Sequence, residues 1–275
     1  MKVEVLILVE NSTPIPGFQG EYGFSALVTV EDKKFLFDTG SGEALMKNAS
    51  LAGIDLAQIN DLIISHGHFD HTGAVLPFLE MGDKKKIYAH SNMFVPRYVV
   101  AGEYKRAIGI QFKAQEIEAR KAEMIFTDDF TDIYPGVFLT GAIPRNTSYE
   151  DVGGSFFAEE SGQLVPDNIA DDMAMVITHT EGLIIISGCA HAGMINTIEY
   201  ARKKTGQSKV LAFIGGTHLI MASEDRLKKT TAALRNLDVQ KIVACHCTGF
   251  NAMLTLRNEL GERVIKGETA MNFQF

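Results

Sequence analysis

Three histidines and one aspartate stand within six consecutive residues, His66-Gly67-His68-Phe69-Asp70-His71. Imidazole nitrogens and carboxylate oxygens are ligands for zinc, manganese and iron, and no thiolate stands among them. In an extended segment alternate residues point the same way, so we expect His66, His68 and Asp70 to share a face. His71 would begin the next helix and point elsewhere. The spacing therefore predicts two adjacent metal ions, one on His66 and His68 and the other on Asp70 and His71.

Predicted strands position these and other polar residues at one edge of a sheet. Strands and helices alternate along the chain, which is typical of α/β proteins, and a short buried strand at Leu62–Ser65 runs directly into the cluster. Further polar residues fall just past the ends of other predicted strands, namely Asp38, Cys189, His191, His218 and His246. Ligands bind at the carboxyl ends of strands in open α/β sheets, so we expect these strand ends to converge on one site.

The second half of the chain repeats the order of elements of the first half. Ala26–Gly40 corresponds to Ala174–Cys189, and Leu62–His68 corresponds to Leu211–His218. The similarity lies in the pattern far more than in residue identity, and it indicates an internal duplication. His218 occupies the position equivalent to His68. A metal ligand, a proton donor and a structural residue all fit there, and we favour a role in the site.

The composition excludes several classes of protein. The 275 residues are 46% apolar, and 34 acidic residues against 26 Lys and Arg give a net charge of −8, which disfavours long nucleic acids. The three cysteines are too few for a disulfide framework, which indicates a reducing compartment. No apolar run approaches the roughly 18 residues of a membrane span. We therefore expect one cytoplasmic domain spanning 1–275, with no nucleic-acid or membrane partner.

The segment 91–133 departs from the alternating pattern and predicts a cap or lid inserted between the halves. Residues Tyr98–Lys121 are expected to be helical, with a solvated surface helix as the alternative to a lid. Five cationic side chains in this helix could meet a phosphate, namely Lys105, Arg106, Lys113, Arg120 and Lys121. The glycine pairs Gly153-Gly154 and Gly215-Gly216 are interpreted as turns, with phosphate binding by their backbone as the alternative.

The histidine cluster resembles the signature of the metallo-β-lactamase-fold superfamily, His-x-His-x-Asp-His after a strand. Upstream, Phe37-Asp38-Thr39-Gly40 is similar to the first motif of that family, in which the aspartate supports the histidine loop by hydrogen bonding. Other stretches resemble the branch that contains the dihydropterin–ribofuranosylaminobenzene phosphate synthase of methanopterin biosynthesis and its uncharacterised relatives. These stretches are Glu21–Ser25, Val165–Asp167, Asp171–Ala174, Ser187–His191 and His246–Gly249. The resemblance runs from Val3 to Phe275 and implies a four-layer αββα sandwich of two duplicated halves with an inserted helical cap.

The resemblance also implies a metal centre of one or two divalent ions, zinc first, with manganese or iron as alternatives. It makes His191 the candidate to complete the first metal site and His246 the candidate to close the second. Many members of the family place a bridging aspartate where this chain has Cys189. A thiolate there could bridge or ligate a metal, and a small buried core thiol is the alternative.

These observations predict a metal-dependent hydrolase or phosphate-ester-processing enzyme. We expect it to act on a small phosphate-bearing molecule, related to pterins, through a metal-bound hydroxide or a metal-activated leaving group. Asp70 and His218 are the candidate catalytic residues. Two alternatives stay open: a di-iron redox protein, which iron content with oxygen turnover would favour, and a non-catalytic metal-binding sensor, which intact ligands without turnover would favour.

Overall fold

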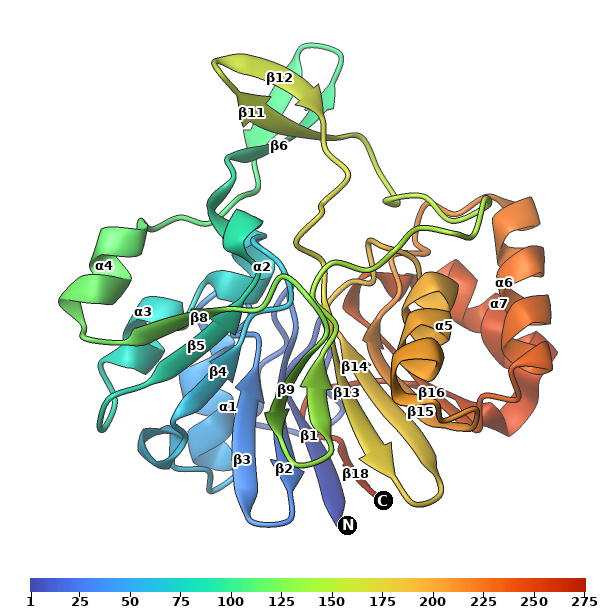
Figure 1. Cartoon of the computed structure of the whole chain (residues 1–275), viewed down its shortest axis with the longest axis horizontal. Helices are drawn as coiled ribbons and strands as arrows, with labels where there is room; N and C mark the ends of the chain where they lie inside the picture. Colours follow the sequence, from blue (N-terminus) through green and yellow to red (C-terminus); the bar gives the residue numbers. More distant parts are fainter. The chain divides into compact units, whose positions relative to one another are not determined.

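The computed structural model describes all 275 residues, which fold as two compact units. Unit 1 comprises Met1–Phe126, Ser155–Asp167 and Glu268–Phe275, and unit 2 comprises Thr127–Gly154 and Asn168–Gly267. Figure 1 labels many of their helices and strands. A single domain over 1–275 and a cap over 91–133 stay predictions.

Unit 1 is built on a seven-stranded sheet with the strand order β18-β1-β2-β3-β4-β5-β8. Strands β2 and β3 form an antiparallel hairpin, whereas β3, β4, β5 and β8 run parallel to one another. The histidine cluster thus follows a strand of the parallel half. The strands are β1 (Val3–Val9), β2 (Ser25–Val30), β3 (Lys33–Phe37), β4 (Asp61–Ile63), β5 (Lys86–Ala89), β8 (Glu123–Phe126) and β18 (Asn272–Gln274).

Both faces of this sheet are buried, because alternate apolar residues point to opposite sides of each strand. Leu36 of β3 packs in one core with Leu45 and Phe78, which come from two helices. On the other face of β3, Phe35 and Phe37 are also completely buried. The helical elements of unit 1 are α1 (Ala44–Leu51), η1 (Leu56–Gln58), α2 (Phe69–Thr72), α3 (Val75–Leu79), η2 (Ser91–Phe94) and α4 (Ala114–Ala119).

A second, four-stranded sheet takes the place of the first part of the helix that was predicted over Tyr98–Lys121. It has the order β12-β11-β6-β7, with β6 (Arg97–Ala101), β7 (Tyr104–Ala107), β11 (Phe156–Glu160) and β12 (Gln163–Pro166). Only α4 is helical in the predicted range. The helix prediction was wrong for the first half of the range because it rested on the charges, whereas Tyr98-Val99-Val100 is a run of residues that favour strands.

Unit 2 is built on a seven-stranded sheet with the strand order β17-β16-β15-β14-β13-β10-β9. Its strands are β9 (Thr131–Tyr134), β10 (Val137–Leu139), β13 (Ala174–His179), β14 (Gly182–Ser187), β15 (Val210–Gly216), β16 (Lys241–Cys245) and β17 (Val264–Lys266). The core joins Phe213 of β15 to Ile198 and Leu256 from two helices. The helical elements are α5 (Met194–Thr205), α6 (Glu224–Asn236), η3 (His246–Thr248), α7 (Phe250–Leu260) and η4 (Gly261–Arg263).

The two sheets share one topology. In unit 1 the antiparallel hairpin β2–β3 is followed by parallel β4, β5 and β8. In unit 2 the antiparallel hairpin β13–β14 is followed by parallel β15, β16 and β17. The predicted α/β class is therefore confirmed, and the corresponding ranges of the predicted duplication occupy equivalent strands.

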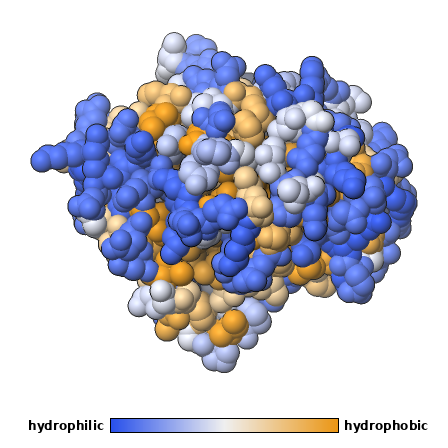
Figure 2. All heavy atoms as spheres, turned by 60° about the horizontal axis from the view of Figure 1, so that its bottom comes forward, coloured by the Kyte–Doolittle hydropathy of each residue, from blue (hydrophilic) through white to orange (hydrophobic).

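The helices are short. The longest one, α6, has 13 residues, and a bilayer span needs about 20 apolar residues, so no helix of this chain is fit to cross a membrane. Figure 2 shows one face of the molecule, on which hydrophilic residues predominate and hydrophobic ones form scattered patches.

Candidate metal centre

The histidine cluster starts where β4 ends, and its four predicted ligands lie together inside unit 1. His66, His68, Asp70 and His71 are each at most 6% exposed. Nε2 of His66 lies 2.9 Å from Nδ1 of His68, and the ring centroids of His66 and His71 are 4.3 Å apart. Oδ2 of Asp70 lies 3.9 Å from Nε2 of His71. The structure thus gathers three imidazoles and a carboxylate in one buried place.

The prediction that His71 points away from the other histidines was wrong. The chain is extended at His68 but turns helical at the next residue, and α2 contains both Asp70 and His71. Strand alternation therefore governs only His66 and His68. The helical turn brings the ring of His71 back beside that of His66.

Asp38 is a fully buried carboxylate that holds the base of the cluster. Its Oδ2 accepts a hydrogen bond from Nδ1 of His71 at 2.7 Å, and its Oδ1 accepts one from the backbone N–H of Ser65 at 2.7 Å. The supporting role that the family resemblance implied for Asp38 is confirmed. Because Nδ1 of His71 donates to a carboxylate, the neutral ring presents its Nε2 lone pair to a metal.

Ser65 performs a similar task for His66, and the sequence analysis missed it. Its hydroxyl donates to Oδ2 of Asp38 at 2.7 Å and lies 2.9 Å from Nδ1 of His66. A hydroxyl has a single proton, so this Nδ1 must be the donor of the second bond, and the lone pair of His66 is on Nε2, the atom that faces Nδ1 of His68. The available signal was the position of Ser65, directly between a buried strand and the first histidine.

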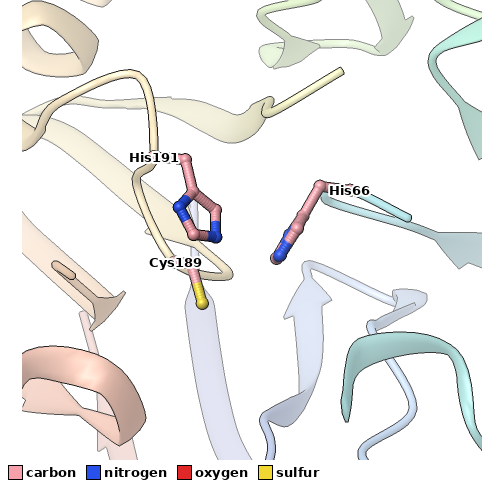
Figure 3. A group of neighbouring side chains, drawn as sticks. All are labelled: His66, Cys189 and His191. Carbon is pink, nitrogen blue, oxygen red and sulfur yellow. The ribbon is translucent and has the colours of Figure 1, made fainter. Parts of the chain in front are cut away.

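The candidate residues of unit 2 lie at the ends of β14, β15 and β16. Figure 3 shows Cys189 and His191 on the loop that follows β14, and it shows His66 on the loop that follows β4 of unit 1. Nδ1 of His191 donates to the carbonyl of Val152 at 2.9 Å, which fixes the tautomer that presents Nε2. The rings of His191 and His218 have centroids 4.3 Å apart.

A second thiol joins this group. The Sγ atoms of Cys189 and Cys247 and a ring nitrogen of His218 all lie within 4.8 Å of one another. Burial raises the pKa of the Cys247 thiol, but a hydrogen bond with Cys189 and the positive charges of His218 and His246 outweigh it and hold this pKa well below its usual value. Cys247 was not among the predicted ligands. Residues His246–Thr248 form a helical turn directly after β16.

Four non-glycine residues at these strand ends adopt left-handed backbone conformations. The φ angle is 54° at Asp38, 52° at Ala190, 47° at His218 and 47° at His246. Such conformations cost about 1–3 kcal/mol each and recur at functional sites. The strain supports the prediction that the strand ends carry the site.

The two glycine pairs of unit 2 pack directly against candidate site residues. A Cβ atom on Gly153, which has φ +84°, would lie 2.1 Å from Nδ1 of His218. A Cβ atom on Gly216 would lie 2.6 Å from Sγ of Cys247. Close packing therefore accounts for these glycines without a phosphate.

Two polar side chains, the exposed Arg145 and the buried Asp172, fix the loop of His191. Arg145 donates to the carbonyl of His191, and Oδ2 of Asp172 accepts a hydrogen bond from the N–H of Ala192 at 2.8 Å. Burial raises the pKa of Asp172 to about 7, against the lowering effects of that N–H and of Arg145. The loop has no regular secondary structure, so these side chains set its position.

Comparison with known proteins decides the family. Residues 19–159 match the model of the Metallo-beta-lactamase superfamily. The 7,8-dihydropterin-6-methyl-4-(beta-D-ribofuranosyl)-aminobenzene-5'-phosphate synthase of Methanocaldococcus jannaschii is 34% identical over 262 residues, which cover 89% of this chain and 87% of the relative. The chain belongs to the metallo-β-lactamase superfamily.

Two further proteins are similar to this chain over most of its length. The uncharacterized protein MJ0448 of the same organism is 31% identical over 92% of this chain and 93% of its own length. The crystal structure of Tm1679, described as a metal-dependent hydrolase of the β-lactamase superfamily, superposes with a TM-score of 0.86 at 29% identity and covers 98% of both chains.

The family predicted from the histidine cluster is thereby confirmed, together with its fold. The roles assigned to individual residues stay predictions. They comprise the catalytic roles of Asp70 and His218 and the metal ligands His66, His68, Asp70, His71, Cys189, His191 and His246.

Asp38→Asn is expected to weaken metal binding about 10–100-fold while the protein stays folded. Asparagine tolerates the left-handed backbone at this position, but its amide cannot replace both carboxylate oxygens that orient His71 and Ser65. The affinity is measured by titration against a competing chelator, and circular dichroism reports the fold.

The matched control for this variant is Asp61→Asn. Asp61 is also a buried carboxylate, but its side chain contacts Lys33 and Tyr88 and no histidine. Its substitution is expected to leave the metal affinity unchanged. Equal metal affinities of Asp38→Asn and the wild type would refute the supporting role of Asp38 in metal binding.

Proposed function

We propose that this protein is a metal-dependent enzyme that acts on a small phosphate-bearing molecule, either by hydrolysis or by displacement of a metal-activated leaving group. The observation that carries the proposal is the buried cluster of His66, His68, Asp70 and His71. Burying so many polar groups is costly unless they are paired or bind a ligand. Nδ1 of His66 is hydrogen-bonded to Ser65 and Nδ1 of His71 to Asp38, so Nε2 is the nitrogen of each ring that would bind a metal.

The donor atoms fit one or two divalent ions, with zinc first and manganese or iron as alternatives. The proposed ligands are His66, His68, Asp70 and His71 of unit 1 and Cys189, His191 and His246 of unit 2. A bound divalent ion would supply Lewis-acid polarisation of a phosphoryl oxygen and a nucleophile at neutral pH.

The protein's own residues have distinct parts in this proposal. Asp38 and Ser65 hold the rings of His71 and His66 in one tautomer. The carboxylate of Asp70 accepts a proton from, or orients, the attacking nucleophile. His218 donates a proton to the leaving group, a role that its ring nitrogens allow near neutral pH.

The phosphate part of the proposal rests on a relative and on local charge. The name of the relative that is 34% identical describes a synthase whose compound bears a dihydropterin and a 5'-phosphate. A synthase joins two molecules, so displacement at a phosphate-bearing carbon or at phosphorus is as compatible with the cluster as hydrolysis. Arg106 on β7 places an exposed positive charge in unit 1, although the chain as a whole carries a net charge of −8.

A substrate screen with and without metal tests the proposed function. The panel contains phosphodiesters, nucleotide pyrophosphates, pterin pyrophosphates, thioesters and lactones. We expect one to two metal ions per chain, turnover confined to phosphate-bearing compounds, and loss of turnover in chelator-treated protein that returns with added metal. Metal-dependent turnover of thioesters or lactones alone would contradict the phosphate part. A metal-loaded protein with no turnover would favour the sensor, and oxygen turnover with bound iron would favour the redox protein.

A further inference from the structure

Two aromatic rings lie beside the histidine cluster in unit 1. The rings of Tyr22 and Phe69 have centroids 6.5 Å apart and planes only 18° from parallel. Phe69 is the residue between His68 and Asp70, so its backbone is part of the segment that carries the cluster. The side chain of Tyr22 is left 59% exposed. A stacked pair of rings with one exposed member provides a surface on which another flat ring can stack.

Arg106 adds a positive charge to these rings. The Cζ atom of its guanidinium lies 5.1 Å from the centroid of the Phe69 ring. Backbone contacts tie its segment to the cluster, because the N–H of Phe69 donates to the carbonyl of Ile108 at 2.9 Å and His68 forms a β-bridge with Gly109. The guanidinium is thus held near the cluster by the backbone as well as by the ring.

Arg106 differs from every other arginine of the chain. Eight of the nine arginines donate a hydrogen bond to a carboxylate or a carbonyl oxygen, as Arg97, Arg120, Arg145, Arg202, Arg226, Arg235, Arg257 and Arg263 do. The guanidinium of Arg106 instead lies over the ring of Phe69. Its five N–H donors suit the oxygens of an anion.

We propose that Tyr22, Phe69 and Arg106 form a substrate-recognition surface, on which the two rings stack a flat heterocyclic or aryl ring and the guanidinium pairs with a phosphate of the same molecule. This inference rests on the proposed function, since it assigns the recognition of that substrate to three named side chains. Arginine matches two phosphate oxygens with a pair of parallel hydrogen bonds, which an ammonium group cannot do. The surface therefore selects molecules that carry both a ring and an anion.

The neighbouring Lys105 provides the matched control. It lies on the same strand, β7, and its Nζ lies 3.9 Å from the centroid of the Tyr98 ring, so it repeats the cation–ring contact away from Phe69. A general effect of positive charge on this hairpin would appear equally in variants of Lys105 and Arg106. A recognition role of Arg106 would appear in the Arg106 variant alone.

Direct binding of two fluorescent probes to the metal-loaded protein tests the inference. The probes are 6-hydroxymethylpterin and its phosphate monoester, and the absence of tryptophan from the chain leaves their emission unobscured. Arg106→Gln is expected to weaken binding of the phosphate ester at least about 10-fold and to leave binding of the unphosphorylated pterin unchanged. Phe69→Leu and Tyr22→Leu are expected to weaken both probes by about 5-fold or more. Lys105→Gln is expected to change neither.

The outcomes separate this inference from the proposed function. Failure of the wild type to bind the phosphate ester, or equal losses in Arg106→Gln and Lys105→Gln, overturns the inference even when the substrate screen finds metal-dependent turnover. Conversely, the expected binding pattern without turnover on any substrate supports the surface and counts against the proposed enzyme. Metal content is measured in every variant. A loss of metal in Phe69→Leu would show that its weaker probe binding comes from damage to the histidine cluster and not from the missing ring.

Discussion

The double variant His66→Ala/His68→Ala is expected to lose one bound metal ion per chain and to retain no more turnover than chelator-treated wild-type protein. Divalent ions such as zinc bind through about four ligands, and removing two imidazoles from one ion leaves too few to hold it. Metal content is measured by elemental analysis of the purified protein, together with circular dichroism. Unchanged metal content would show that His66 and His68 are not ligands of the same ion.

The variant His90→Ala/His179→Ala is the control for this experiment. It also removes two buried imidazoles, but Nδ1 of His90 accepts the N–H of Asn92 and Nδ1 of His179 accepts the N–H of Glu181. We expect its metal content to equal that of the wild type. Loss of metal from both double variants would indicate a general loss of folded protein.

Arg97→Ala is expected to lower the free energy of unfolding by about 3–5 kcal/mol. Nε of Arg97 lies 2.8 Å from Oδ2 of Asp167, and the two side chains are only 1% and 9% exposed. Removing the arginine leaves a buried carboxylate without its counter-charge, which is more costly than losing an ordinary contact. The arginine also packs against Gly67 within the histidine cluster, so a lower metal affinity should accompany the lower stability. Urea unfolding of the metal-loaded protein measures the change.

Two further variants serve as comparisons for the loss of stability expected in Arg97→Ala. Arg120→Ala breaks the pair with Glu80, whose side chains are 27% and 63% exposed, and it should cost no more than about 1 kcal/mol. Adding Asp167→Asn to Arg97→Ala removes the uncompensated charge and should restore part of the lost stability. Equal unfolding free energies for Arg97→Ala and Arg120→Ala would show that burial of the pair contributes nothing.

Much of this fold was predictable because its strands are short apolar runs between helices and turns. The predicted strand Leu62–Ser65 overlaps β4, and the predicted correspondence of Ala26–Gly40 with Ala174–Cys189 falls on the hairpins β2–β3 and β13–β14. The metal-ligand cluster was predictable for another reason, since four ligand-type residues stand within six positions. Apolar runs and clustered ligand-type residues can be recognised within a few neighbouring positions, so they were visible in the sequence.

The remaining features depend on residues that are distant in the sequence. Asp38 meets Ser65 and His71 across 27 and 33 positions, so the role of Ser65 in orienting His66 was not visible in its own segment. Arg97 meets Asp167 across 70 positions. Within the Tyr98–Lys121 range, pairing of β6 with β11 across the chain stabilises strands where local charge had indicated a helix. Tertiary pairing outweighed local propensity there.

The pairing of β1 with β18 has a consequence for how the nascent chain folds. Glu4 lies opposite Gln274, so the edge of the unit 1 sheet is completed by residues that follow the whole of unit 2 in the sequence. While the ribosome is still synthesising unit 2, this edge of β1 has no partner, and an unpaired strand edge is a template for association with other chains. Contacts of such long sequence separation also form slowly. The growing chain is therefore exposed to aggregation until Glu268–Phe275 emerge, and the docking of β18 is the last step in assembling the sheet of unit 1.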